Sequence, residues 1–254
     1  MNLPEQLVLV TGGARGLGRC IVEAFASEGS RIVINYRESA QAAEELAATI
    51  GPERAVAIQA DITDPSAVDA LFNAAHEHFK TPVTTVVNNA LVDFSFNGDA
   101  RPGPADIDWN SFDTQFTGSV RGALNTVQAA LPGMREHGFG RVINIGTNLF
   151  QDPVVPYHDY TAAKAALLAL TRTLAADLGP DNISVNMVSG GLLKTTDASA
   201  ATPNEVFDYI ASSTPLRKAT TPAEFADAIM FFASPWSRAV TGQNLVVDGG
   251  LVMD

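Results

Sequence analysis

A tyrosine and a lysine four positions apart are the strongest candidates for acid–base chemistry in this sequence. Tyr160 and Lys164 would share one face of a helix. A free phenol has a pKa of about 10 and is a poor acid or base at neutral pH. A nearby ammonium favours the phenolate, so we expect it to lower that pKa. The hydroxyl of Thr147 lies 13 positions before Tyr160 in the sequence. A phenol with a lowered pKa can act as an acid–base group at neutral pH.

A glycine-rich turn near the start of the chain is the candidate nucleotide-binding feature. Residues 11–18 read Thr-Gly-Gly-Ala-Arg-Gly-Leu-Gly and stand between an apolar run and an amphipathic stretch. Glycines permit a tight turn and a close approach of pyrophosphate, and the following helix offers free N–H groups and partial positive charge. The residues expected to contact a dinucleotide here are Gly12, Arg15, Gly16, Leu17 and Gly18.

Taken together, the motifs resemble those of the short-chain dehydrogenase/reductase family along nearly the whole chain. They are the turn Thr-Gly-x-x-x-Gly-x-Gly, Asn88-Asn89-Ala90, Tyr160-Thr161-Ala162-Ala163-Lys164, Thr241-Gly242-Gln243 and Val247-Asp248-Gly249-Gly250. The N-terminal and C-terminal stretches are most similar to 3-oxoacyl-[acyl-carrier-protein] reductases and their relatives.

This resemblance implies a carbonyl reductase in which Tyr160 donates a proton as a nicotinamide cofactor delivers hydride. It also implies that Lys164 bonds the nicotinamide ribose. The serine of the family is replaced by Thr147, and the asparagine of its central helix by Ser119, whose backbone carbonyl could still hold a water that leads to the lysine. Further cofactor contacts implied by the resemblance are Asp61, Ile62, Asn89, Ala90, Tyr160, Lys164, Gly191 and Thr195. The Pro-Gly of the family reads Gly190-Gly191, which we expect to loosen the substrate loop.

The residues after the second apolar run favour NADP(H) as the cofactor. A carboxylate there would bond the 2′-hydroxyl of NAD and repel a 2′-phosphate. This chain has Tyr36 followed by Arg37, and Arg15 lies in the glycine turn. Two guanidiniums near the ribose favour a phosphate dianion.

The motifs leave the reaction partly open. We expect reduction of a 3-oxoacyl thioester or similar small carbonyl substrate, but the same residues could oxidise a secondary alcohol. The departures at Leu91, Ser119, Thr147 and Gly190 also allow a non-catalytic, nucleotide-sensing relative. The chain has a net charge of −12, so we expect a free ketone or small thioester in preference to a group on an acidic carrier protein.

The elements that position these residues alternate between short apolar runs and longer amphipathic stretches. Strands are predicted at residues 7–10, 32–34, 55–58, 84–87, 141–145, 183–188 and 245–247. Helices are predicted at residues 16–28, 39–50, 65–79, 108–134, 159–178 and, in short form, 204–211. This pattern predicts an α/β fold: one doubly wound Rossmann-type domain over residues 1–254, with a seven-stranded, mostly parallel sheet covered on both faces. The long connections 91–107 and 190–221 are the expected substrate loops.

Composition excludes several classes of function. The acidic charge makes nucleic acids and anionic membranes poor partners, and no apolar run approaches the length of a membrane span. One cysteine rules out an internal disulfide, and no metal site is expected. We therefore expect a cytoplasmic protein. The resemblance implies a homodimer or homotetramer formed through the helices at 108–134 and 159–178.

Overall fold

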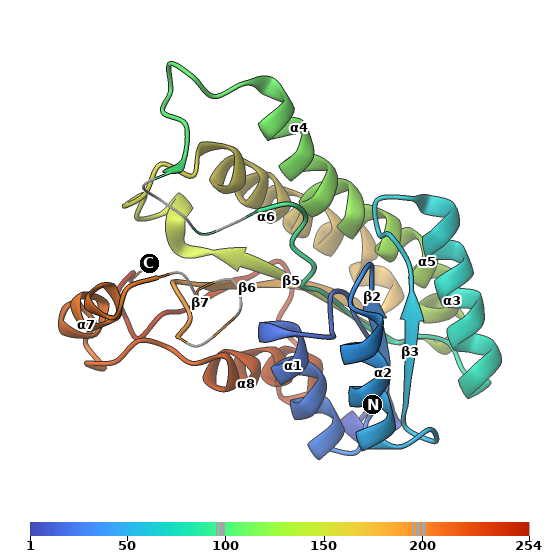
Figure 1. Ribbon diagram of the computed structural model, residues 1–254. Helices are drawn as coiled ribbons and strands as arrows, with labels where there is room; N and C mark the ends of the chain where they lie inside the picture. The colour runs from blue at the N-terminus through green and yellow to red at the C-terminus, as the bar shows by residue number, and fades with distance from the viewer. Residues whose placement is uncertain (95, 97–99, 195, 197–198, 200–201, 254) are drawn as a thin grey trace.

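The strands of the computed structural model form one sheet, shown edge-on in Figure 1. The structure describes residues 1–94, 96, 100–194, 196, 199 and 202–253. All neighbouring strands pair in parallel, in the order β3-β2-β1-β4-β5-β6-β7. The strands are β1 (Leu7–Val10), β2 (Arg31–Tyr36), β3 (Ala55–Gln59), β4 (Thr85–Asn88), β5 (Gly140–Thr147), β6 (Ile183–Gly190) and β7 (Asn244–Val247).

The strands are apolar on both faces because helices cover both sides. Side chains alternate along a strand, so Val8 and Val10 pack in one core cluster while Leu7 and Leu9 pack in another. All four are fully buried. The prediction of a doubly wound α/β fold with a seven-stranded parallel sheet is confirmed.

Two helical layers enclose the sheet. Helices α1, α2 and α8 contribute to the first core cluster, and α3, α5 and α6 to the second; Figure 1 shows α1 and α8 on one side of the sheet and α6 on the other. The helices are α1 (Gly16–Ser27), α2 (Ala40–Ile50), α3 (Pro65–Phe79), α4 (Trp109–Phe116), α5 (Gly122–His137), α6 (His158–Leu178), α7 (Asn204–Ser213) and α8 (Pro222–Ala233). Short turns of 3₁₀ helix are η1 (Leu3–Glu5), η4 (Asn148–Phe150), η5 (Gly179–Asp181) and η6 (Pro235–Ser237). None of the helices formed by the described residues is long and apolar enough to cross a bilayer.

The central helix differs from the continuous α-helix expected over residues 108–134. It runs from α4 through a π-helical turn, η3 (Thr117–Arg121), into α5. The turn lies where neighbouring segments come very close: a Cβ on Gly118 would stand 2.7 Å from Cβ of Val92, and one on Gly122 would stand 2.7 Å from Cδ1 of Ile62. Such turns often occur at functional sites, and Ser119 lies in this one.

Helix α8 is absent from the elements that the apolar pattern predicts. Its N-terminus nevertheless carries a complete start signal. Thr221 accepts a hydrogen bond from the backbone N–H of Glu224, whose carboxylate accepts one from the N–H of Thr221. Pro222 occupies the first turn. Its buried residues follow a helical period, but apolar residues such as Met230 and Phe231 also lie between them, so the sequence shows no clear polar face.

The fold brings the ends of β1 and β4 together at a topological switch point. These strands are neighbours, although β2 and β3 separate them in sequence. Ligands of open α/β sheets bind in the crevice outside the carboxyl ends of the strands at such a point. The glycine turn follows β1, and the connection that begins with Asn89 follows β4.

Candidate active site

The glycine turn after β1 forms a cradle that no larger side chain would leave intact. Gly12 and Gly16 have positive φ angles of 61° and 52°. A Cβ on Gly18 would stand 2.2 Å from the carbonyl oxygen of Gly12 and 2.7 Å from Nδ2 of Asn89. Helix α1 begins at Gly16, and its N-cap residue Arg15 provides no side-chain cap. The backbone N–H groups of Gly16, Leu17 and Gly18 lie in the first turn of α1, where the N-terminus of a helix can bind a pyrophosphate.

Residues after β4 brace this turn from the other side of the crevice. The amide of Asn89 donates to the carbonyl oxygens of Thr11 at 2.9 Å and Gly12 at 3.3 Å. The hydroxyl of Thr11 in turn accepts from the N–H groups of Asn89 and Ala90. Asn35 adds a third brace by accepting from the N–H of Gly12. The amide of Asn89 thus holds the nucleotide turn in shape, which is a role in addition to the cofactor contact expected of it.

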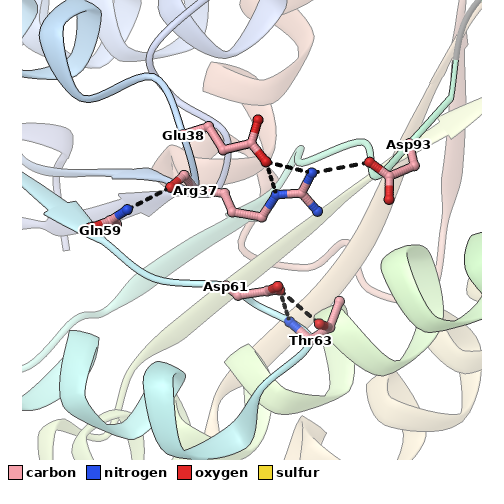
Figure 2. Close-up of polar contacts among 6 residues, drawn as sticks. All are labelled: Arg37, Glu38, Gln59, Asp61, Thr63 and Asp93. Carbon is pink, nitrogen blue, oxygen red and sulfur yellow. Dashed lines mark hydrogen bonds and ion pairs between the residues drawn. The ribbon is translucent and has the colours of Figure 1, made fainter.

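Figure 2 shows the charged group where we expect the adenosine end of the cofactor. Arg37 follows β2 and donates from Nη2 to a carboxylate oxygen of Asp93, 3.0 Å away, on the connection after β4. Its Nε also donates to Glu38. The side chains of Arg37 and Asp93 are 40% and 62% exposed, so water reaches the pair. Unlike the side chain of Arg37, that of Tyr36 is buried, and it packs in the first core cluster.

Asp61 and Ile62 close the same end of the crevice after β3. The carboxylate of Asp61 accepts from the backbone N–H and the hydroxyl of Thr63 (Figure 2). Burial raises the pKa of Asp61, but the bonds from Thr63 and the charge of Arg37 outweigh it, so the pKa lies below the usual value. The carbonyl oxygen of Ile62 accepts from Asn125 on α5. These bonds fix both residues after β3, and their contact with a nucleotide base stays a prediction.

The three residues predicted to act on a carbonyl come together at the other end. Thr147 is the last residue of β5, while Tyr160 and Lys164 lie in the first two turns of α6. A hydrogen bond joins the side chains of Thr147 and Tyr160. Lys164 donates from Nζ to the carbonyl oxygen of Ile145 at 2.8 Å, and the same Nζ stands 5.7 Å from the centre of the Tyr160 ring. All three predicted side chains are buried.

The expectation that Lys164 lowers the pKa of the phenol is wrong for this arrangement. Burial raises the pKa of Tyr160 to about 12, although the hydrogen bond with Thr147 acts in the opposite direction. Burial also lowers the pKa of Lys164 to about 8. The physical reason is that the ammonium bonds Ile145 while the phenol is removed from water. Tyr160 is therefore neutral at physiological pH, the form that can donate a proton.

Aromatic side chains cover the phenol. The ring of Phe94 stacks on that of Tyr160, with centres 4.6 Å apart and planes 25° apart. Phe96 contacts the same ring edge-on at 5.6 Å. Tyr157 packs edge-on against Phe94 at 5.2 Å. We call Phe94, Phe96 and Tyr157 the aromatic wall; it leaves Tyr160 only 6% exposed.

The remaining predicted site residues lie in β6, in the connection after it and in the central helix. Ser119 is buried in the π turn η3. Gly191 lies beside Asn148 and Asp248, which are joined by a 2.9 Å hydrogen bond. Gly190 is the last residue of β6, and a Cβ on it would stand 2.8 Å from the ring of Phe225. Thr195 lies outside the described residues.

The ion pair between Arg101 and Asp159 was not predicted from the sequence. Arg101 donates from Nη2 to both carboxylate oxygens of Asp159, each 2.6 Å away. A hollow of about 590 Å³ lies between the segment that precedes α6 and the first turns of that helix; Tyr157 and His158 line it, whereas Tyr160 and Thr147 do not. Among the described residues, no three His, Cys, Asp or Glu side chains gather as metal ligands. The single sequence signal was a carboxylate, Asp159, directly before the tyrosine of the motif.

Comparisons with known proteins agree with this geometry. Residues 12–252 match a family model described as "Enoyl-(Acyl carrier protein) reductase". The chain is 30% identical to NADPH-dependent aldehyde reductase 2, chloroplastic, of Arabidopsis thaliana, over 99% of this chain and 95% of that one. It is 32% identical to versicolorin reductase stcU of Emericella nidulans, over 98% and 96% of the two chains.

A mycobacterial relative and a solved structure complete the comparison. The 3-oxoacyl-[acyl-carrier-protein] reductase MabA of Mycobacterium tuberculosis is 30% identical over 97% of this chain and 92% of its own. The crystal structure of a blue fluorescent protein from a metagenomic library, in complex with NADPH, has a TM-score of 0.87 at 32% identity and covers 100% of both chains. The chain therefore belongs to the short-chain dehydrogenase/reductase family.

Proposed function

We propose that this protein reduces a ketone to a secondary alcohol with NADPH. The observation that carries the proposal is the junction of Thr147, Tyr160 and Lys164 beside the crevice where the glycine turn lies. A proton donor and a hydride donor must reach the oxygen and carbon of one carbonyl group. The end of β5 and the start of α6 bring the proton donor to the same edge of the sheet as the nucleotide cradle.

NADPH is the proposed cofactor because of the residues around Arg37. No carboxylate occupies the last position of β2, which is Tyr36, while Arg37 next to it offers a guanidinium. The pair of Arg37 and Asp93 is exposed, and exposed ion pairs exchange partners at little cost. A 2′-phosphate can thus replace Asp93. The plant relative named above is called NADPH-dependent, and the solved relative holds NADPH.

Each side chain then has one task in the reaction. A bound NADPH supplies the hydride to the carbonyl carbon. The hydroxyl of Thr147 holds the carbonyl oxygen, and Tyr160 gives that oxygen its proton. Lys164 would bond the ribose of the cofactor and would supply positive charge near the phenolate that Tyr160 becomes. The raised pKa of Tyr160 keeps the proton on the phenol until the oxygen gains charge.

The proposed substrate is a 3-oxoacyl thioester or a similar small carbonyl compound. We infer that the substrate is a free ketone or small thioester, because the chain offers little positive charge to attract an acidic carrier protein. Helix α6 carries Arg172 against Asp177, and the whole chain has a net charge of −12. MabA is named as a 3-oxoacyl-[acyl-carrier-protein] reductase and stcU as a versicolorin reductase, so relatives of similar identity are named for different substrates.

A substrate panel with both cofactors tests this proposal. Acetoacetyl-CoA, ethyl acetoacetate and the same 3-oxoacyl group on a carrier protein would be offered with NADPH and with NADH, and the loss of absorbance at 340 nm recorded. Crotonyl-CoA would test reduction of a carbon–carbon double bond, and a secondary alcohol with NADP⁺ would test the oxidative direction. Turnover of a ketone with NADPH is expected. Cofactor binding without turnover on any of these compounds would instead favour the nucleotide-sensing alternative.

We also propose a homodimer or homotetramer formed through the central helix and α6. Trp109 on α4 is 72% exposed and stacks on Phe112. An exposed tryptophan on a helix is a candidate interface residue. Light scattering after size exclusion would give the number of chains, and Trp109→Glu is expected to lower it.

A further inference from the structure

The ion pair between Arg101 and Asp159 stands directly beside the proposed proton donor. Asp159 precedes Tyr160 in the first turn of α6, and Arg101 lies on the connection between β4 and α4. Nη2 of Arg101 is 2.6 Å from both carboxylate oxygens, and the side chains are 15% and 3% exposed. Both charges have therefore been taken largely out of water.

Stability alone does not explain this pair. A carboxylate in the first turn of α6 suits the helix dipole, but it needs no arginine for that. Burying two charges costs about as much as their attraction returns, so a buried pair is weak support for a fold. Nε of Arg101 is also buried and has no hydrogen-bond partner among the described residues, which adds to the cost. The arrangement is better explained by what the guanidinium holds in place.

The same guanidinium also covers the aromatic wall. Cζ of Arg101 stands 4.4 Å from the centre of the Phe94 ring and 5.9 Å from that of Tyr157. Phe94 in turn stacks on Tyr160 at 4.6 Å. A cation, a phenyl ring and the phenol thus form one stack, and Asp159 fixes its outer end from the residue next to Tyr160.

We propose that Arg101 and Asp159 are positioning residues that hold Phe94 against Tyr160 and so keep the phenol dry and in one orientation. The proposal rests on the proposed function in one respect, that Tyr160 is the proton donor. The wall removes water from the phenol, consistent with the raised pKa of Tyr160. A fixed donor needs little reorganisation when the carbonyl oxygen arrives.

Nitration of tyrosines by tetranitromethane tests the holding of the ring without any turnover. The chain has four tyrosines. Tyr209 is 72% exposed and serves as the nitrated reference, while Tyr36 is 9% exposed and serves as the protected one. In Arg101→Met and in Asp159→Asn, we expect Tyr160 to be nitrated at least about 10-fold faster than in the parent, as peptide mass mapping would show. Arg101→Lys keeps the charge but loses the flat guanidinium. In this variant, the nitration rate of Tyr160 should lie between that of the parent and that of Arg101→Met.

Kinetics with acetoacetyl-CoA and NADPH test the consequence for the reaction. In both variants kcat should fall about 10-fold, whereas KM and the Kd of NADPH should change less than about 3-fold. Arg135→Met is the matched control, because it removes a guanidinium from an exposed pair with Asp181 far along the central helix. That variant should keep the parental kcat and nitration pattern.

The outcomes separate this proposal from the proposed function. Unchanged nitration of Tyr160 in folded variants would overturn the positioning role, whatever the kinetics. Turnover retained in Tyr160→Phe would overturn the proton-donor role of Tyr160. Nitration of Tyr160 in the Arg101 and Asp159 variants would still test whether the ion pair holds the ring. If either single variant melts early because one buried charge is left alone, Arg101→Met with Asp159→Leu removes both charges, and faster nitration of Tyr160 is still expected.

Discussion

Two ion pairs attach the connection after β4 to the two ends of the crevice, and they differ in nearly every physical respect. At the adenosine end, Asp93 and Arg37 are 62% and 40% exposed. At the carbonyl end, Arg101 and Asp159 are 15% and 3% exposed, and the rings of Phe94 and Tyr157 lie beside the guanidinium. Water weakens the first pair and leaves it exchangeable, whereas the second pair can be broken only at high cost. Under the two proposals above, one end would admit a charged ligand while the other would keep a phenol fixed.

The largest expected effect is at the carbonyl end. Tyr160→Phe removes the phenol oxygen and keeps the ring that stacks on Phe94. Turnover of acetoacetyl-CoA should fall by about 10³-fold or more, the upper part of the range for a positioned acid. The Kd of NADPH, measured from its fluorescence, should stay near that of the parent. Arg135→Met, which removes an exposed side chain of α5 outside the expected substrate loops, is the control and should leave both unchanged.

A second substitution at the same end tests the hydroxyl beside the phenol. Thr147→Ala should lower kcat about 10²-fold, because the carbonyl oxygen loses a hydrogen-bond donor. Thr147→Ser keeps the hydroxyl and should stay active. Thr147 also accepts a bond from the N–H of Leu149, so a melting curve must accompany the kinetics. An alanine variant as active as the parent would remove Thr147 from the mechanism.

The contrast between the two ends also explains what the sequence could and could not predict. All seven strands of the sheet follow from apolar runs. The signal is clearest for inner strands such as β1 and β4, which are buried along their whole length and need no partner information to be recognised. The motif residues that meet at the site follow from the resemblance. The π turn at Ser119 does not, because it depends on how closely Val92 and Ile62 approach the central helix.

Long-range contacts set the remaining properties of the site. Arg101 and Asp159 are 58 positions apart in the sequence, and no local pattern joins them. The spacing of Tyr160 and Lys164 led us to expect a lowered pKa for the phenol. Burial, to which the stacked ring of Phe94 contributes, raises that pKa instead. Helix α8 is a different case, because the capping residues Thr221 and Glu224 were readable while its apolar period was not.

A change of cofactor preference is the third expected effect, and it concerns the adenosine end. Arg37→Ala with Tyr36→Asp removes a guanidinium and adds a carboxylate that can bond a ribose 2′-hydroxyl. The kcat/KM with NADPH should fall about 10-fold or more, the scale of one charge-assisted hydrogen bond, while that with NADH should rise. Because Tyr36 is buried, Arg37→Ala alone is the necessary companion variant. Equal or better kcat/KM with NADH in the parent would contradict the assignment of NADPH.

The smallest expected effect comes from the exposed pair itself. Asp93 has a positive φ of 46°, a conformation that asparagine tolerates, so Asp93→Asn removes the charge with little strain. Without its competitor, Arg37 should bind 2′,5′-ADP about 2- to 5-fold more tightly at low salt, the range for an exposed ion pair. Binding of 5′-AMP should not change, since it lacks the 2′-phosphate. At about 1 M salt, where the screening length is about 3 Å, the difference should vanish. Asp106→Asn, at an exposed position on the same connection, is the control for net charge. Tighter binding that persisted at high salt would mean that Asp93 acts on the shape of the connection and not through its charge. The ion pair at the adenosine end would then have a positioning role, like the pair at the carbonyl end, despite its exposure.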